Sequence, residues 1–255
     1  MIDIKDYFTE ASNISCIPNE EYENLSDIIE AIDAMSRTTY RGISVIDCYK
    51  QNFLYVSDNN YFLYGFTVGE VKELGFNFYI NQMQYNDKQI FEEMDIVVYQ
   101  FLQNYPVENI KDFTLSYDFY IMDKYCEQKR LVNHQVTPLK LTKEGKVWLA
   151  LCVTTHPSNK KAGNITIHKK KAEVYWIYDK KNKKWCQISL PKLSDTEKDI
   201  LKLFIMGFKT DEVASRINRS PEMVKIHRKR IFNKFGTKNI LETITFAKNH
   251  RLHIY

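Results

Sequence analysis

Apolar residues recur every three or four positions over residues 22–37 (YENLSDIIEAIDAMSR), and this spacing predicts an amphipathic helix. The apolar stripe consists of Leu25, Ile28, Ile29, Ile32 and Met35. Two roles remain open for this helix, packing on the domain that follows or contact with a second copy of the chain. We treat residues 1–37 as an N-terminal helical segment.

The pattern then changes to short β-like runs. GISVIDCY and NFLYVSDN are rich in β-branched and aromatic residues and are separated by a polar step, which predicts a hairpin. Helical spacing follows between Thr67 and about Leu102. In TVGEVKELG, Thr67 and Glu70 have the spacing of a capping box, and DKQIFEEMDIVVYQFLQNY predicts a longer helix that ends before Pro106.

Four longer runs with strand character come next: DFTLSYDFYIMD, RLVNHQVTPLKLT, GKVWLALCVTTH and AEVYWIYDK. Turn-forming stretches such as KEGK join them, and KKNKK predicts a hairpin tip. Residues 38–188 are therefore expected to form an α+β domain, an antiparallel sheet with helices inserted early.

The last part of the chain has helical spacing throughout. KLSDTEKDILKLFIMGF opens with Ser194 and Glu197 as a capping box and closes at Gly207. KTDEVASRI predicts a second, short helix, and NRS predicts a tight turn. Residues 189–255 are therefore expected to form an all-α domain with the spacing of a helix-turn-helix.

The third helix of this domain has clear boundaries. Ser220 is placed to cap it, Pro221 suits the first helical position, and Gly236 can adopt the left-handed conformation that ends it. At 100° per residue, one arc collects Val224, Ile231 and Phe235, with His227 and Arg228 at its borders. The opposite face holds Glu222, Lys225, Ile226, Lys229 and Asn233.

That outward face suits the major groove of double-stranded DNA. Lysines reach guanine acceptors and an isoleucine contacts a thymine methyl, so we expect the base-facing residues to be Lys225, Ile226 and Lys229. Phosphate contacts are expected on the rim, from Arg230, Lys234, His227 and Lys209, and packing within the helix remains an alternative for His227.

Charge supports this division. The net charge is +4, but Lys192–Tyr255 holds 14 Lys and Arg against 7 Asp and Glu, a net +7, and residues 1–191 hold 22 against 25, a net −3. Nucleic-acid affinity depends on local neutralisation of phosphates, so the C-terminal part is the expected DNA-contacting part. Lysines 169–171 and 180–184 suggest a second such surface, for which solvated hairpin tips are the alternative.

Two resemblances to known families agree with these readings. The stretch from LSDTEKDIL through DEVASRINRS and MVKIHRKRIFNKFG to TKNILETITFA strongly resembles the LuxR-type, or GerE-type, helix-turn-helix of bacterial transcription factors, although Met223 stands where the family usually has Thr. In that family the helix matching Pro221–Phe235 enters the major groove. Residues 38–188 resemble a PAS-type sensor domain, best in FLYVSDNNYFLYGFTVGEVKELG and YNDKQIFEEM.

The resemblances imply a transcription regulator. Its expected partners are double-stranded DNA and a second copy of the chain in a homodimer, with RNA polymerase as a further candidate. A small apolar or aromatic molecule is a candidate ligand of the PAS-like domain. Its pocket would involve Phe66, Phe78, Tyr117, Phe119, Trp148 and Trp176, and the alternative is that these residues only fill a core.

Other classes of protein are disfavoured. The chain has no apolar run of about 18 residues and no secretion signal, so we expect a cytoplasmic protein without membrane contact. Five scattered cysteines fit reduced, mostly buried thiols. No cofactor or metal is expected, and no nucleophile or phosphate-loop motif suggests an enzyme. The remaining rival is a protein-interaction module that acts on the transcription machinery without reading bases.

Overall fold

The computed structural model describes residues 14–125, 128–157 and 159–249, and these form two compact units. The first unit runs to Ala172 and also includes Trp176–Cys186. The second unit contains Glu173–Tyr175 and continues from Gln187. The expected fold class is confirmed, because the first unit is built on an antiparallel sheet with helices and the second is helical.

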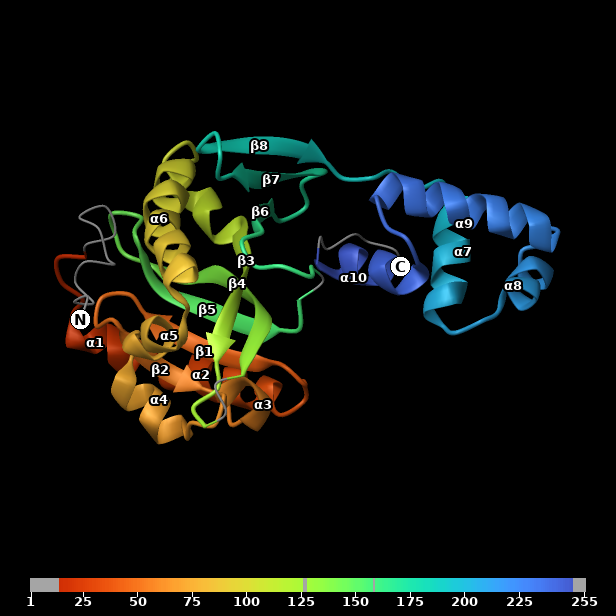
Figure 1. Cartoon of the computed structure of the whole chain (residues 1–255). Helices are drawn as coiled ribbons and strands as arrows, with labels where there is room; N and C mark the ends of the chain where they lie inside the picture. The colour runs from red at the N-terminus through yellow and green to blue at the C-terminus, as the bar shows by residue number, and fades with distance from the viewer. Residues whose placement is uncertain (1–13, 126–127, 158, 250–255) are drawn as a thin grey trace. The chain divides into compact units, whose positions relative to one another are not determined.

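An eight-stranded sheet dominates the first unit, in the order β2-β1-β5-β4-β3-β6-β7-β8 (Figure 1). The long central strands β3, β4 and β5 are antiparallel neighbours, and their register places Tyr117 opposite His134 and Val136 opposite Cys152. The strands are β1 (Gly42–Asp47), β2 (Asn52–Val56), β3 (Phe113–Met122), β4 (Lys129–Leu141), β5 (Val147–Thr155), β6 (Ile165–Lys169), β7 (Val174–Asp179) and β8 (Lys184–Ser189).

The expected hairpin of β1 and β2 is confirmed, and the helices follow it in the predicted place. Thr67 accepts a hydrogen bond from the Glu70 backbone and the Glu70 carboxylate accepts one from the Thr67 backbone, which is the predicted capping box. The helical elements of this unit are α1 (Asn19–Glu23), α2 (Ser26–Ser36), α3 (Asn60–Leu63), α4 (Val68–Leu74), α5 (Asn77–Gln82), α6 (Tyr85–Leu102) and the 3₁₀ helix η2 (Val107–Asp112).

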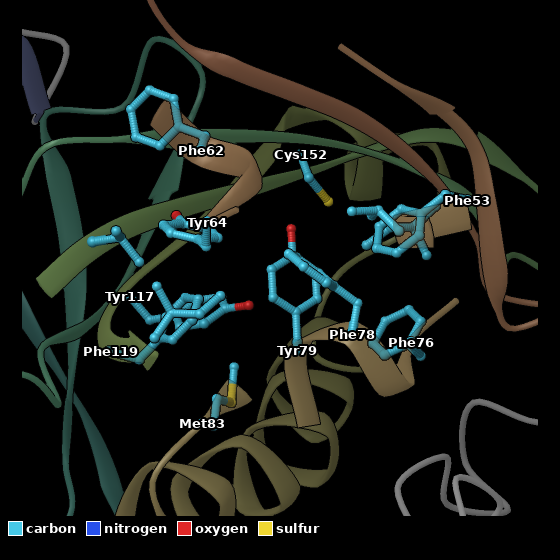
Figure 2. Packing of buried hydrophobic residues seen from close by; sticks show 14 of the residues in the cluster. Phe53, Phe62, Tyr64, Phe76, Phe78, Tyr79, Met83, Tyr117, Phe119 and Cys152 are labelled. Carbon is cyan, nitrogen blue, oxygen red and sulfur yellow. The ribbon is translucent and has the colours of Figure 1, made fainter. Parts of the chain in front are cut away.

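The two faces of the sheet bury separate apolar clusters. Successive side chains of a strand point to opposite faces, and accordingly Leu149 belongs to one cluster while Ala150 and Cys152 belong to the other. The larger cluster gathers aromatic residues around Tyr79 of α5, with Tyr117 and Phe119 on one side of it and Phe53 and Phe76 on the other (Figure 2).

The N-terminal helix predicted over residues 22–37 is broken near Asn24 into α1 and α2. Its packing role is observed. Ile32 is buried against the sheet with Val45 and Leu149, and Tyr55 donates a hydrogen bond of 3.0 Å from its hydroxyl to Asp33. Met35, predicted in the apolar stripe, is 45% exposed.

Two strands were not predicted, β6 and β8. With β7 they extend the sheet beyond β3, and aromatic residues join this extension to α6. Trp185 of β8 donates a hydrogen bond of 3.2 Å from Nε1 to the Val97 carbonyl of α6, and its ring lies 5.2 Å from that of Phe101. The KKNKK stretch forms the turn between β7 and β8, as predicted.

The described cysteines differ in burial. Cys152 is buried, Cys48 and Cys186 are half-buried, and Cys16 is exposed, so among the described cysteines the expectation of mostly buried thiols holds only for Cys152. Cys126 lies outside the described residues.

The second unit contains the three predicted helices, α7 (Asp195–Ile205), α8 (Thr210–Arg216) and α9 (Pro221–Phe235), followed by α10 (Ile240–Asn249). Its core is a separate cluster in which Ile200, Leu201, Val213 and Val224 are fully buried. The capping box of Ser194 and Glu197 begins α7, as predicted.

Candidate nucleic-acid interface and ligand cavity

Helix α9 presents two contrasting faces. Val224, Ile231 and Phe235 are 0%, 1% and 5% exposed and pack in the core of the second unit. The opposite face is exposed along its length, through Glu222, Lys225, Ile226, Lys229 and Asn233. An apolar side chain between two lysines on an open helix face is suited to contact base edges as well as phosphates.

The turn that connects α8 to α9 is short. Asn218 adopts a left-handed φ of 52°, a conformation that Asn tolerates better than most residues. Ser220 then accepts a hydrogen bond of 3.3 Å from the Met223 backbone, and Pro221 occupies the first turn. At the other end Gly236 has a φ of 64° and stops the helix, as predicted. Helices α8 and α9 therefore form a helix-turn-helix.

An ion pair with a buried carboxylate joins the start of α7 to the end of α9. The Glu197 side chain is 4% exposed, and its Oε2 accepts hydrogen bonds from Lys234 Nζ at 2.7 Å and from the Ser194 backbone at 2.8 Å. Burial alone raises the pKa of Glu197, but these bonds outweigh it and the pKa is lowered. Lys234 Nζ also donates to the Lys192 carbonyl at 2.9 Å. Lys234, expected to contact phosphate, thus makes internal bonds through its ammonium group.

The other expected rim residues lie in different surroundings. Arg230 is exposed on α9, and Lys209 is exposed at the position that precedes α8. His227 is half-buried, and its Nδ1 is buried without a hydrogen-bond partner among the described residues. A contact that the sequence did not reveal is that of Arg216, whose guanidinium stacks 3.9 Å from the centre of the Phe208 ring.

The first unit contains a cavity of about 210 Å³ between α6 and the sheet. Phe91, Met94, Val98 and Leu102 line it from α6. Its closed end is formed by buried residues, among them Ile46, Tyr79, Tyr117, His134 and Ala150, whereas Gln103, which also lines it, is exposed.

A hydrogen-bonded pair lies at that closed end. The Tyr117 hydroxyl oxygen and His134 Nδ1 are 2.7 Å apart, and His134 Nε2 is buried with no partner among the described residues. Burial lowers the pKa of His134 to about 3 and raises the pKa of Tyr117 well above its usual value. Both side chains are therefore uncharged at neutral pH.

The predicted pocket residues are mostly placed elsewhere. Tyr117 lines the cavity, but Phe66, Phe78 and Phe119 pack in the larger apolar cluster without lining it. Trp148 belongs to the cluster under α2, and Trp176 packs near the end of α6 with Phe101 and Phe113. For these five residues the alternative of core filling is the one observed.

Within residues 14–125, 128–157 and 159–249, no group of three or more His, Cys, Asp or Glu is arranged to hold a metal ion. Over the same ranges, no helix has both the length and the apolar character needed to cross a bilayer.

Comparison with known proteins relates the second unit to a protein family. Residues 191–247 match the GerE family, bacterial regulatory proteins of the luxR family. A curated relative is the Fimbriae Z protein of Salmonella typhimurium, 33% identical over 60 residues, which are 24% of this chain and 29% of that protein. The chain thus matches less than a third of that relative's length.

Solved structures with a similar course include a phage VqmA in complex with DPO, at 16% identity and a TM-score of 0.32 over 90% of each chain. VqmA of Vibrio cholerae is 15% identical with a TM-score of 0.31, over 87% of each chain. The N-terminal domain of a diguanylate cyclase with a PAS/PAC sensor from Marinobacter aquaeolei is 13% identical, with a TM-score of 0.33, over 46% of this chain and 94% of that one.

The capping box of α7, the short turn into α9 and the family match therefore agree, and residues 191–247 are a helix-turn-helix domain of the luxR family of bacterial regulatory proteins.

Proposed function

We propose that the chain is a sequence-specific, double-stranded-DNA-binding transcription regulator that works as a homodimer in the cytoplasm. The single observation that carries this is the exposed face of α9, where Lys225, Ile226 and Lys229 lie together on a helix-turn-helix whose other face is fully packed. In the proposed complex these three residues read base edges in the major groove.

We also assign the phosphate contacts to particular residues. Arg230 and Lys209, both exposed, bind phosphates and fix the register of the helix on the duplex, and His227 contributes at the border of the interface. Lys234 holds α7 and α9 together through Glu197, so its part in phosphate binding is secondary. A dimer is required because one small domain selects a site weakly, and two copies read half-sites about 34 Å apart.

Residues 38–188 are the proposed sensory and dimerisation domain, between a helical segment at 1–37 and the DNA-binding domain at 189–255. The cavity between α6 and the sheet is the proposed site of a small-molecule ligand. Its lining is mostly apolar with a few polar groups, which is typical of small-molecule sites.

The test uses full-length protein and its Lys225→Ala/Lys229→Ala variant, each incubated with fragmented genomic DNA that is then sequenced. We expect one short inverted repeat to be enriched by the parent and not by the variant. Each lost base contact is worth about 1–3 kcal/mol, so affinity for the repeat should fall roughly thirtyfold or more.

A matched control removes the same charge from another helix. Lys198→Ala/Lys202→Ala changes two lysines of α7 whose ion pairs are with Asp195 and Asp199 on the same helix. This control variant should still enrich the inverted repeat. Enrichment of the same repeat by the α9 variant would refute base reading by α9, and DNA binding with little salt dependence would favour the protein-interaction module instead.

A further inference from the structure

The Tyr117–His134 pair has one hydrogen more than it can use internally. A neutral imidazole carries one N–H and a phenol carries one O–H, while a single hydrogen bond joins the two side chains at 2.7 Å. If the hydroxyl donates to Nδ1, the spare hydrogen is on Nε2, which has no partner among the described residues. If Nδ1 donates to the oxygen, the spare hydrogen is on the hydroxyl. Either tautomer leaves one donor unused.

Such an unused donor is uncommon in a protein interior. Most buried polar groups are hydrogen-bonded, because a buried donor without an acceptor loses its hydration without compensation. Tyr117 is 4% exposed and His134 is 1% exposed, so bulk water does not supply the acceptor. Both residues line the cavity. Because His134 Nε2 has almost no accessible surface, an acceptor on an occupant would meet the pair at the Tyr117 hydroxyl, with Nδ1 donating to the hydroxyl oxygen.

The cavity also limits the size and charge of an occupant. An apolar cavity of about 150 Å³ holds a benzene molecule, so about 210 Å³ accommodates one substituted ring of roughly nine to twelve non-hydrogen atoms. The closed end offers no compensating charge, since the pKa of His134 is lowered to about 3 and the tyrosines stay protonated. Asp95 and Lys146 also line the cavity, but a charged group placed among Tyr79, Tyr117 and His134 would be desolvated without a charged partner.

We propose that the cavity between α6 and the sheet binds a small uncharged molecule, of about one substituted ring, whose hydrogen-bond acceptor is recognised by the Tyr117–His134 pair. This inference deepens the proposed ligand site and rests on that part of the proposed function. The pair is the specificity determinant, and the apolar residues of α6 supply the contact area.

The test uses three probes of equal size, nine non-hydrogen atoms each, with the full chain and without DNA. Acetophenone carries a carbonyl acceptor, cumene has an apolar branch in its place, and benzoate carries a charge. Dissociation constants come from calorimetry and ligand-observed NMR. Cumene is the more hydrophobic of the neutral probes, so a cavity without a working donor should prefer it.

We expect acetophenone to bind about tenfold more tightly than cumene, because its carbonyl accepts a hydrogen bond from a buried donor that otherwise has no partner. Benzoate should bind far more weakly than either. Each single variant leaves a donor, so the double variant Tyr117→Phe/His134→Leu is needed. It should reverse the preference toward cumene. Tyr178→Phe removes another buried tyrosine hydroxyl, one that donates to Glu93 and lies outside the cavity, and should leave the preference unchanged.

Ala150→Leu should abolish binding of both neutral probes, because Ala150 lines the closed end and the larger side chain fills it. Equal or tighter binding of cumene by the parent would overturn the proposal, as would binding of benzoate at the level of acetophenone, or no binding of either neutral probe at millimolar concentration. The three-probe comparison on the parent needs no variant to fold. Because DNA is not a readout, a negative result leaves the DNA-binding proposal standing, and failure of DNA binding leaves this one standing.

Discussion

Replacing Glu197 should weaken the helix-turn-helix domain more than any change on its surface. The side chain is 4% exposed, caps the first turn of α7 and pairs with Lys234 at the end of α9. Loss of a cap costs about 1 kcal/mol. Removing one partner of a fully buried ion pair costs about 3–5 kcal/mol. Lys234 is 40% exposed and regains water, so the second contribution is smaller here.

We therefore expect Glu197→Ala to lower the free energy of unfolding of this domain by about 2–3 kcal/mol. A domain of this size has only about 3–9 kcal/mol of stability, and each kcal/mol corresponds to about 4–8 °C in Tm. The expected result is a fall of roughly 10–20 °C in the melting transition of the second unit. Hydrogen exchange at the amides of α7 and α9 assigns that transition in the full chain.

The pH dependence of a second variant, Glu197→Gln, separates the effect of charge from that of shape. The pKa of Glu197 is lowered in the folded protein, so its contribution to stability is complete above the unfolded pKa and is lost as pH falls through the folded value. Glu197→Gln should be less stable than the parent at pH 7, and the difference should shrink below about pH 4. A Tm change no larger than that of Lys198→Ala, or a difference that is constant with pH, would refute the reasoning.

Three further changes have simple expected outcomes. Gly236→Ala should destabilise α9 by about 1–2 kcal/mol in chemical denaturation, because the residue has a φ of 64°, whereas Gly236→Asn should be milder; equal effects would contradict this. Trp185→Phe should speed hydrogen exchange in α6 by roughly fivefold through loss of the bond to Val97, and unchanged exchange would show that the bond carries no stability. A thiol reagent should label exposed Cys16 in the native chain and leave Cys152 unlabelled, since burial raises the pKa of Cys152; mass spectrometry of the peptides decides.

Local signals in the sequence were sufficient to place most elements. Capping boxes at Thr67 and Ser194, the proline at 221 and the glycine at 236 act within a few residues of themselves, so their meaning does not depend on the rest of the fold. The helical wheel of α9 was equally reliable, because its three buried residues contact one core.

Long-range arrangement was harder to predict. Strands β6 and β8 are only five and six residues long, and β8 has only half-buried and exposed positions, so its burial does not alternate. Aromatic composition did not identify the cavity, because the register of β3 and β4 decides which rings face α6. The pairing of Tyr117 with His134 across 17 residues, and of Glu197 with Lys234 across 37, appears in no local pattern.

The division of β7 and β8 between the two units has a consequence for modularity. Glu173 accepts a backbone hydrogen bond from Leu190 at 2.8 Å and pairs with Lys192 at 2.6 Å, while Trp185 of the same hairpin is bonded to α6. A single cut in the sequence, at any point between residues 173 and 192, separates partners on one side or the other. Recombination that exchanges sensor domains among such proteins would keep these bonds only when the hairpin is inherited whole together with α6, with the join placed after Lys192.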